Sequence, residues 1–256
     1  MTKKNAALLQ LSEESKDIVY RFAAFNDYFS VDWFSGRPDW LPSRIVDAVV
    51  FLEKKRWIGA RSGGNGCYEW TPKFPREEIL RQIEGETLSR YYREAIDILI
   101  EKLPESEAHY IDIAQKCLLA GIRKSDIEII YRAAISEEKH HHISQAIRLY
   151  NHLLEFIADQ VLDNTEQPDI GTYEIFIRAV ERRASLSLLH PNLKAIDRFL
   201  SLALDMSACF TDLKTQASLQ LLIGQNYWMS FQYEKALYHF DQGWEMVGRL
   251  KDDALY

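Results

Sequence analysis

The sequence predicts a mainly α-helical protein, with a small winged helix-turn-helix over residues 1–75 and a superhelix of paired helices over residues 76–256. Three observations lead to this prediction. Glycine and proline cluster in the first third of the chain, and the remainder has the composition of nearly continuous helices. Two aromatic-rich runs flank a glycine-rich turn within residues 57–71. Near the C-terminus, small and aromatic residues recur at helix–turn–helix repeat offsets.

The totals exclude several classes of protein. A formal net charge of −7 argues against nucleic-acid binding by overall charge. No apolar run approaches the roughly 20 residues that span a bilayer, and the N-terminus lacks the pattern of a signal peptide. Cys67, Cys117 and Cys209 are scattered and odd in number, which predicts mostly buried thiols rather than disulfides or a zinc site. We therefore expect a cytoplasmic protein.

The first unit begins with a helix signal at Ser12, which is followed by two glutamates and then by an apolar stripe. A short second element is expected at Val31–Phe34. Pro42 opens a third helix, whose apolar positions are Ile45, Val46, Val49, Val50 and Leu52. The runs at residues 57–61 and 67–71 predict a β-hairpin, expected to be the only β-structure. Three helices followed by a hairpin are typical of a winged helix.

A winged helix raises the alternative of a DNA-binding transcription regulator. Its contacts would be Arg44, Lys54, Lys55, Arg56 and Arg61. However, residues 1–75 carry 11 basic and 9 acidic residues, and the first turns of the third helix are mostly apolar. A helix that reads bases would place polar side chains there. We therefore expect this unit to face protein rather than DNA.

The remainder predicts successive helices. Their expected ranges are 77–103, 108–119 (with a glycine C-cap at Gly121), 125–138, 143–162 and 173–189. Ala146, Ala195 and Ala236 each begin the same pattern, in which a bulky residue follows four positions later. Their separations of 49 and 41 residues exceed the ideal repeat of about 34 residues. The repeats are therefore degenerate, and an irregular helical bundle is the alternative.

The stretch Gln220–Gly243 carries the strongest repeat signal. Gly224 is followed by Tyr227, and Ala236 by Phe240 and then Gly243, at the offsets of a tetratricopeptide repeat. Small residues at Gly224 and Ala236 allow two helices to approach closely. We therefore predict that Ala236 is buried against the helix that carries Gly224.

Three segments extend this pattern to a known family. LSEESKDIVYRFAAF, TPKFPREEILRQI and HYIDIAQKCLLAG resemble the start of the winged helix, the stretch after the wing, and the helix before the repeats in signal-transduction ATPases with numerous domains, including MalT-type regulators. The resemblance implies a winged helix plus tetratricopeptide-like repeats. The sequence has no G-x-x-x-x-G-K-[ST] phosphate loop, and Leu250–Tyr256 looks like the start of another repeat helix. We therefore expect a segment of a longer protein, with the ATPase upstream.

The function expected from these patterns is non-catalytic: regulation and protein binding within a signal-transduction ATPase or transcriptional regulator. We find no catalytic constellation and expect no cofactor and no metal. The cluster His140–His142, with His152, is expected at a solvated turn, because consecutive helical residues point about 100° apart. An enzyme whose site forms only with further domains is a third alternative.

The expected partner is a protein or another domain of the same parent chain. Candidate protein-binding residues are Tyr227, Trp228 and Trp244. Self-association is expected through the last repeat, at Trp244, Val247 and Leu250.

Overall fold

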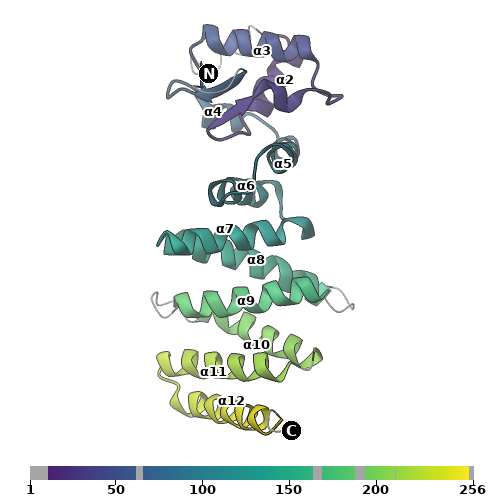
Figure 1. Cartoon of the computed structure of the whole chain (residues 1–256). Coiled ribbons are helices and arrows are strands. Elements are labelled where there is room, and N and C mark those ends of the chain that lie inside the picture. The colour runs from purple at the N-terminus through teal and green to yellow at the C-terminus, as the bar shows by residue number, and fades with distance from the viewer. Residues whose placement is uncertain (1–10, 62–65, 164–168, 188–193, 211, 254–256) are drawn as a thin grey trace. The chain divides into compact units, whose positions relative to one another are not determined.

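The computed structural model describes residues 11–61, 66–163, 169–187, 194–210 and 212–253. The predicted tip of the hairpin at 62–65, parts of the predicted breaks at 164–171 and 190–191, and residues 254–256 lie outside the described residues. The chain forms two compact units, Met1–Ile122 and Arg123–Tyr256, which carry purple to teal and teal to yellow colours in Figure 1.

The first unit begins with α2 (Glu13–Phe22), and the predicted cap is present, because Ser12 Oγ accepts a hydrogen bond from the Ser15 backbone N at 3.2 Å. The strand β1 (Tyr28–Ser30) and the 3₁₀ turn η1 (Val31–Phe34) follow. Helix α3 (Pro42–Lys54) starts at a proline, whose fixed φ suits the first helical position.

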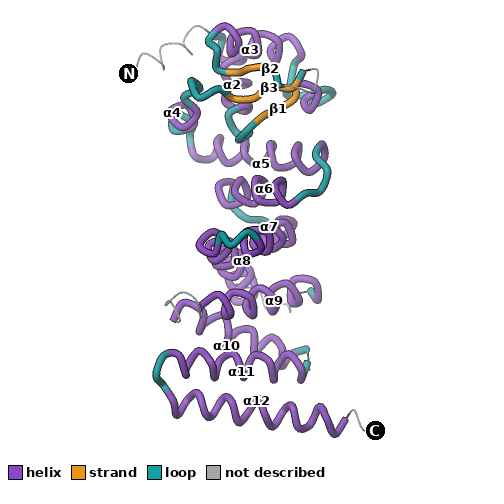
Figure 2. The backbone as a smooth tube through the Cα atoms, turned by 60° about the vertical axis from the view of Figure 1, so that its left-hand side comes forward, coloured by secondary structure: helices purple, strands orange, loops and turns teal. Residues whose placement is uncertain are grey.

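The sheet of this unit contains the predicted hairpin (Figure 2). In the described residues it has the order β1-β3-β2, with β2 (Ile58–Ala60) and β3 (Cys67–Trp70) antiparallel. The prediction that the hairpin is the only β-structure is wrong, because β1 also pairs with β3. β1 is three residues long, too short to show alternation in the sequence.

An aromatic core joins these elements. The rings of Phe22 and Phe29 stack with centroids 4.3 Å apart, and those of Phe34 and Trp40 stack at 4.0 Å. These side chains come from α2, β1, η1 and the loop before α3. Aromatic stacking therefore holds the short strand β1 against the helices.

The predicted long helix over residues 77–103 is divided into α4 (Arg76–Leu80) and α5 (Gly85–Lys102). Glu84 is extended, with ψ 142°, and the next residue, Gly85, has low helix propensity. Helix α6 (Glu107–Ala120) ends at Gly121, which has φ 84° and confirms the predicted glycine C-cap.

The first compact unit extends beyond residue 75 because α5 contacts α2 and η1, and α6 packs against α5. A compact unit is defined by its internal contacts and does not by itself set a domain boundary. The predicted separate domain over residues 1–75 therefore stays a prediction.

The second unit is built from helices in sequence order (Figure 1). After the short turn η2 (Lys124–Asp126), these are α7 (Ile127–Lys139), α8 (Ile143–Asp163), α9 (Ile170–Ser187), α10 (Lys194–Cys209), α11 (Leu213–Met229) and α12 (Tyr233–Asp253). Each helix packs against the next, so α7/α8, α9/α10 and α11/α12 form pairs. The predicted helices after residue 125 are therefore confirmed within a few residues.

The turns inside the first and last pairs are the same structure 90 residues apart. His141 and Phe231 both have φ 61°, a conformation uncommon for residues other than glycine. In the first turn, the backbone N of His142 donates to Glu137 O at 2.9 Å; in the last, that of Gln232 donates to Tyr227 O at 3.0 Å. The two pairs are therefore repeats of one motif.

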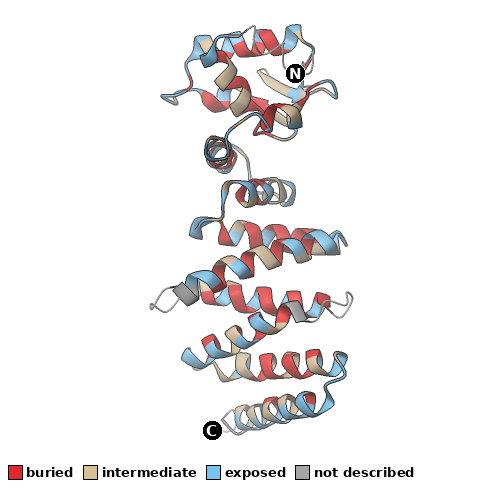
Figure 3. Ribbon diagram, turned by 180° about the vertical axis from the view of Figure 1, so that it is seen from behind, coloured by how far each residue is buried: buried red, intermediate tan, exposed pale blue. Residues whose placement is uncertain are grey.

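Close helix contact in the last pair confirms the predicted register. Ala236 is fully buried, and a Cβ built on Gly224 would lie 2.6 Å from the Phe240 ring and 3.1 Å from Ala236 O. A Cβ on Gly243 would lie 3.0 Å from Leu221. Small residues here allow α11 and α12 to approach each other closely. Figure 3 shows buried residues along α7 to α11, whereas α12 is mostly exposed or intermediate.

The first helices of the pairs keep a regular spacing. Ala134, Ala179 and Gly224 lie on α7, α9 and α11, are all buried, and are separated by 45 residues each. The alanines of the second helices are separated by 49 and 41 residues. The irregularity noted in the sequence thus belongs to the second helices.

Candidate protein-binding surface

The first helices of the pairs form a continuous surface, because α7 contacts α9 and α9 contacts α11. Two pockets lie on it. The pocket between α7 and α9 has a volume of about 560 Å³, and the pocket between α9 and α11 about 430 Å³. Among the described residues, the lining of both comes from these helices and from the α11 N-cap. Arg178 and Glu181 line both pockets, which are therefore neighbours.

A polar cluster borders the pocket between α7 and α9. Tyr150 Oη donates a hydrogen bond to Glu138 Oε2 at 3.0 Å, and Arg182 Nη1 forms an ion pair with the same oxygen at 3.1 Å. Burial, followed by the charge of Glu138, raises the pKa of the Tyr150 hydroxyl above its usual value. Tyr150 therefore remains a neutral donor, and the cluster positions Glu138 and Arg182 at the pocket.

The pocket between α9 and α11 is bordered by the start of α11. Asp212 caps this helix, since its Oδ1 accepts a hydrogen bond from the Thr215 backbone N at 3.0 Å. Ser218 Oγ donates to Glu181 Oε1 at 3.0 Å, which joins α11 to α9. Arg178 forms a long, exposed ion pair with Glu174, at 3.4 Å. Its guanidinium can therefore exchange that partner for a ligand.

The lining of the two pockets has mixed charge. Its ionisable residues are Glu138, Glu174, Glu181 and Asp212 on the acidic side and Arg178, Arg182 and Lys214 on the basic side. Apolar lining is limited to a few side chains such as Ile135 and Ile177. This surface suits a polar peptide segment that carries both signs of charge, rather than an apolar small molecule.

The predicted protein-binding residues do not line either pocket. Tyr227 is half-buried, and its ring stacks on His239 with centroids 5.4 Å apart. Trp228 is 50% exposed at the end of α11, and Trp244 is 70% exposed on α12. The structure thus separates Trp244 from the surface of the first helices, and a role for these three residues in binding stays a prediction.

The predicted DNA-contact residues differ in their surroundings. Arg44 forms an ion pair with Glu14 at 2.8 Å, and the Arg61 guanidinium lies 3.8 Å from the centre of the Tyr28 ring. Lys55 lies over the Phe51 ring, while Lys54 and Arg56 are exposed. Three of the five basic groups are therefore already in contact with neighbouring side chains that DNA would have to displace.

The outer face of α3 is mostly apolar and acidic, with the exposed Lys54 at its C-terminal end. Val46 and Val50 are more than half exposed, and Asp47 and Glu53 are also exposed. Neither valines nor carboxylates attract phosphates. This composition favours protein contact over DNA contact on α3.

The histidine cluster lies at the turn between α7 and α8, as predicted. His142 Nδ1 lies 2.7 Å from Glu137 Oε2, and His140 Nδ1 lies 2.8 Å from Ser136 O. Among the described residues, no group of three or more His, Cys, Asp or Glu side chains is arranged to hold a metal ion. Of the three cysteines only Cys117 is buried, so the prediction of mostly buried thiols is wrong for the exposed Cys209.

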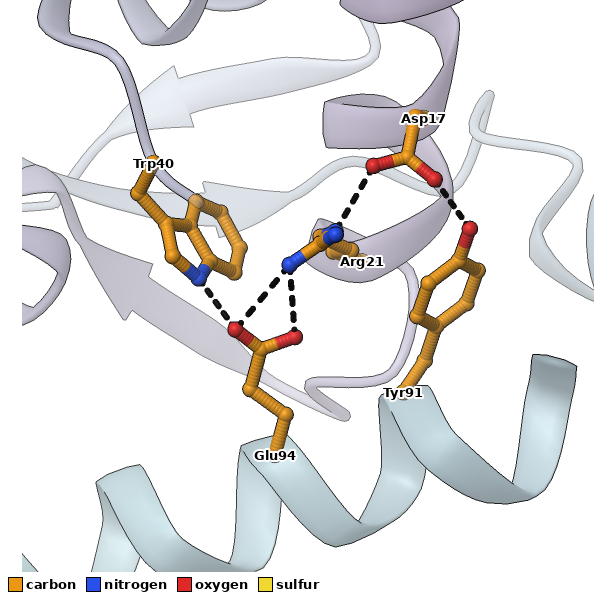
Figure 4. Close-up of polar contacts among 5 residues, drawn as sticks. All are labelled: Asp17, Arg21, Trp40, Tyr91 and Glu94. Atoms are coloured by element: carbon orange, nitrogen blue, oxygen red, sulfur yellow. Dashed lines mark hydrogen bonds and ion pairs between the residues drawn. The ribbon is translucent and has the colours of Figure 1, made fainter. Parts of the chain in front are cut away.

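Sequence reasoning missed a polar cluster in the first unit (Figure 4). Arg21 Nη1 lies 3.0 Å and 3.1 Å from the two carboxylate oxygens of Glu94, and Arg21 Nε lies 2.7 Å from Asp17 Oδ2. Trp40 Nε1 donates to Glu94, and Tyr91 Oη donates to Asp17. The cluster fastens α5 to α2 and to the loop before α3. No sequence signal pairs residues so far apart.

Burial, reinforced by the hydrogen bond to Asp17, raises the pKa of Tyr91 to about 12. A second contact joins α6 to the loop between α2 and β1, because Asn26 donates to Asp112, which also binds the buried Lys116 at 2.6 Å. These contacts position elements within the first unit.

Comparison with solved structures finds TPR-like helical repeats. A putative kinesin light chain with nearly identical TPR-like repeats, from Podosopora anserina, aligns over 94% of this chain and 99% of its own, with a TM-score of 0.43 and 11% identity. A signal transduction ATPase with numerous domains and a tetratricopeptide repeat sensor, from Pyrococcus horikoshii, aligns over 95% of this chain and 46% of its own, at TM-score 0.41 and 14% identity. BtubC from P. vanneervenii aligns over 98% of this chain and 93% of its own, at TM-score 0.41 and 12% identity.

Neither a protein-family model nor a curated protein matches the sequence. Likeness at these TM-scores is too distant to support an argument about function. The assignment of repeated helix pairs rests instead on the matching turns and close helix contacts of α7–α12. In the described residues, no helix combines the length and the apolar character needed to cross a membrane.

Proposed function

We propose that this chain is a non-catalytic regulatory segment that binds a protein partner on the surface of α7, α9 and α11. One observation carries the proposal. In the part of the chain that the structure describes, the first helices of successive pairs and the α11 N-cap line two neighbouring pockets, which share Arg178 and Glu181. Stacked helix pairs use such extended surfaces to bind peptides and other domains. The mixed charge of the lining indicates an extended polar segment as the ligand.

The segment, in this proposal, belongs to a signal-transduction ATPase and carries a winged helix before the repeats. The support for the winged helix is the element order α2, β1, η1, α3, β2, β3 together with the sheet order β1-β3-β2. The support for the protein class is the sequence resemblance of three segments. In this arrangement the winged helix contacts protein and the paired helices recognise the partner.

Peptide selection tests the binding surface. A library of random peptides displayed on phage is selected against the full chain, and the affinities of the recovered peptides are measured. We expect Arg178→Glu to weaken them by tenfold or more, because it reverses a charge shared by both pockets. Arg148→Glu is the matched control, since Arg148 is exposed on α8 and lines neither pocket. Recovered peptides that bind both variants equally would contradict the proposal.

The DNA-binding alternative has its own test. We expect no sequence-specific binding at physiological salt, because a balance of +2 over residues 1–75 provides few phosphate contacts. The test is a mobility-shift titration with random and selected duplexes. Sub-micromolar binding that is lost in the triple variant Lys54→Ala, Lys55→Ala and Arg56→Ala would establish the alternative.

A further inference from the structure

The outward face of α12 differs from the matching faces of the other second helices. Counting from the repeat alanine, the positions 8, 11 and 12 residues later are buried in α8 and in α10. They are Leu154, Ile157 and Ala158 in α8, and Ala203, Met206 and Ser207 in α10. In α8 and α10 these positions lie on helices that pack against the first helix of the following pair, α9 and α11.

The same positions of α12 are Trp244, Val247 and Gly248. Trp244 is 70% exposed, Val247 is half-buried, and a Cβ on Gly248 would meet no atom within 4 Å. Leu237, one heptad before Trp244, is 55% exposed. These side chains share one side of the helix, because residues seven or eleven positions apart face the same way. α12 thus exposes the surface that its counterparts use to bind a helix.

The charges on this face indicate the chemistry of its partner. In α8, Asn151 Oδ1 accepts a hydrogen bond from Nε of the buried Arg183 of α9 at 2.7 Å. The matching position of α12 is Asp241, an exposed carboxylate with no ion pair among the described residues. Glu234 lies on the same side of α12, whereas Glu245 already forms an ion pair with Arg249 at 2.5 Å. A partner arginine therefore binds more strongly at this position of α12 than at that of α8, because the carboxylate of Asp241 replaces the amide of Asn151.

We propose that this face, formed by Leu237, Asp241, Trp244, Val247 and Gly248, binds an amphipathic α-helix of a partner protein. The apolar stripe of the partner helix covers Trp244 and Gly248, and an arginine on it pairs with Asp241. Two copies of this chain fit less well, because face-to-face contact would bring Glu234 and Asp241 of each copy near the same charges of the other, while Arg249 is already paired with Glu245. The face is separate from the pockets of the first helices.

The probe for this face is the helix that already covers its counterpart. A labelled peptide with the sequence of residues 170–187, stapled between the exposed positions 174 and 178 to hold it helical, is titrated against the full chain, and binding is followed by fluorescence anisotropy. We expect saturable binding that Trp244→Ala weakens about tenfold. Trp228→Ala is the matched control, since Trp228 is also an exposed tryptophan but lies on α11.

A charge exchange tests the pairing with arginine. Asp241→Arg should weaken binding about tenfold, and a peptide with aspartate in place of Arg183 should restore it on that variant while binding the unchanged chain poorly. Thermal melts check that each variant folds, which the exposure of both side chains favours. No saturable binding, binding insensitive to Trp244→Ala and Asp241→Arg, or sedimentation showing a dimer that Trp244→Ala abolishes would each overturn the proposal.

Discussion

Two glycines on neighbouring helices should respond to the same substitution with opposite signs. Gly224 lies inside α11 and Gly248 inside α12, so alanine gains about 1 kcal/mol of helix propensity at either position. At Gly248 the new methyl group meets no atom within 4 Å. At Gly224 it would lie 2.6 Å from two carbons of the Phe240 ring. Only Gly224→Ala therefore requires neighbouring atoms to move.

The magnitude follows from these contacts. Overpacking of a tight interior costs about 1–3 kcal/mol. The nearby backbone carbonyl of Ala236, at 3.1 Å, limits relaxation, so we expect a cost in the upper part of this range, about 2–3 kcal/mol. We expect Gly224→Ala to lower the free energy of unfolding by about 1–2 kcal/mol, after allowing for propensity. Gly248→Ala should raise it by up to about 1 kcal/mol. For a chain of this size, the midpoints of thermal unfolding should differ by roughly 4–10 °C.

Differential scanning calorimetry of the full chain measures both variants. Because the chain has two compact units, the transition that contains α11 and α12 is assigned by comparing the two variants. Phe240→Leu should destabilise the original chain but cost less, or nothing, in Gly224→Ala, since it removes the atoms that clash. Equal midpoints for Gly224→Ala and Gly248→Ala would refute the close packing of α11 against α12 at Gly224.

Three further substitutions test other contacts. Tyr91→Phe should lower the free energy of unfolding by about 1 kcal/mol at neutral pH, because it removes the hydrogen bond to Asp17. The pKa of Tyr91 is raised to about 12, so the contribution of this hydrogen bond is complete below pH 10 and is lost as the pH rises toward 12. The melting temperatures of the variant and the original chain should therefore converge there. Asp169→Ala should lower the free energy of unfolding by about 1 kcal/mol at pH 7, because α9 loses its N-terminal cap. Hydrogen bonds from Lys124 and then Thr172 lower the pKa of Asp169 from its ordinary value of 3.8. Urea unfolding should therefore show the difference between variant and original chain disappearing as the pH falls below 3.8. Burial lowers the pKa of the Arg183 guanidinium, whose Nε is bound by the neutral Asn151. Asn151→Asp gives Arg183 an anionic partner and should raise the free energy of unfolding by about 1 kcal/mol. A lower melting temperature would contradict this.

Local signals in the sequence predicted local structure well. Ser12, Pro42 and Gly121 marked helix ends, because caps and backbone preferences act within a few residues. The pairing of Gly224 with Ala236 was also predictable, since the two residues lie on helices joined by a short turn. Gly85 indicated a helix break, but the amphipathic pattern of residues 77–103 predicted one continuous helix, and the break before Gly85 was missed.

Contacts between distant residues were not predictable in this way. The strand β1 exists because Phe29 and its neighbours pair with β3 about 40 residues later, and nothing local in Tyr28–Ser30 requires a strand. The pocket residues Arg178 and Glu181 resemble any exposed charged positions of a helix in the sequence. Only the stacking of α7, α9 and α11 gives them a common surface. The sequence instead favoured the tryptophans Trp228 and Trp244 as binding residues, because aromatic side chains stand out in a sequence whether or not they lie on a common surface.

The even spacing of Ala134, Ala179 and Gly224 has a consequence for how such a chain can change in length. The first helices that carry the pockets remain 45 residues apart, while the alanines of the second helices shift to intervals of 49 and 41 residues. The additional residues between Ala179 and Ala195 are thus compensated by a shorter interval between Ala195 and Gly224. We expect a short insertion between Ser187 and Lys194 to leave the pocket surface intact, provided that α10 can shift along its neighbours. The connection inside the middle pair is therefore the place where a fluorescent label or an affinity tag could be added with the least effect on binding.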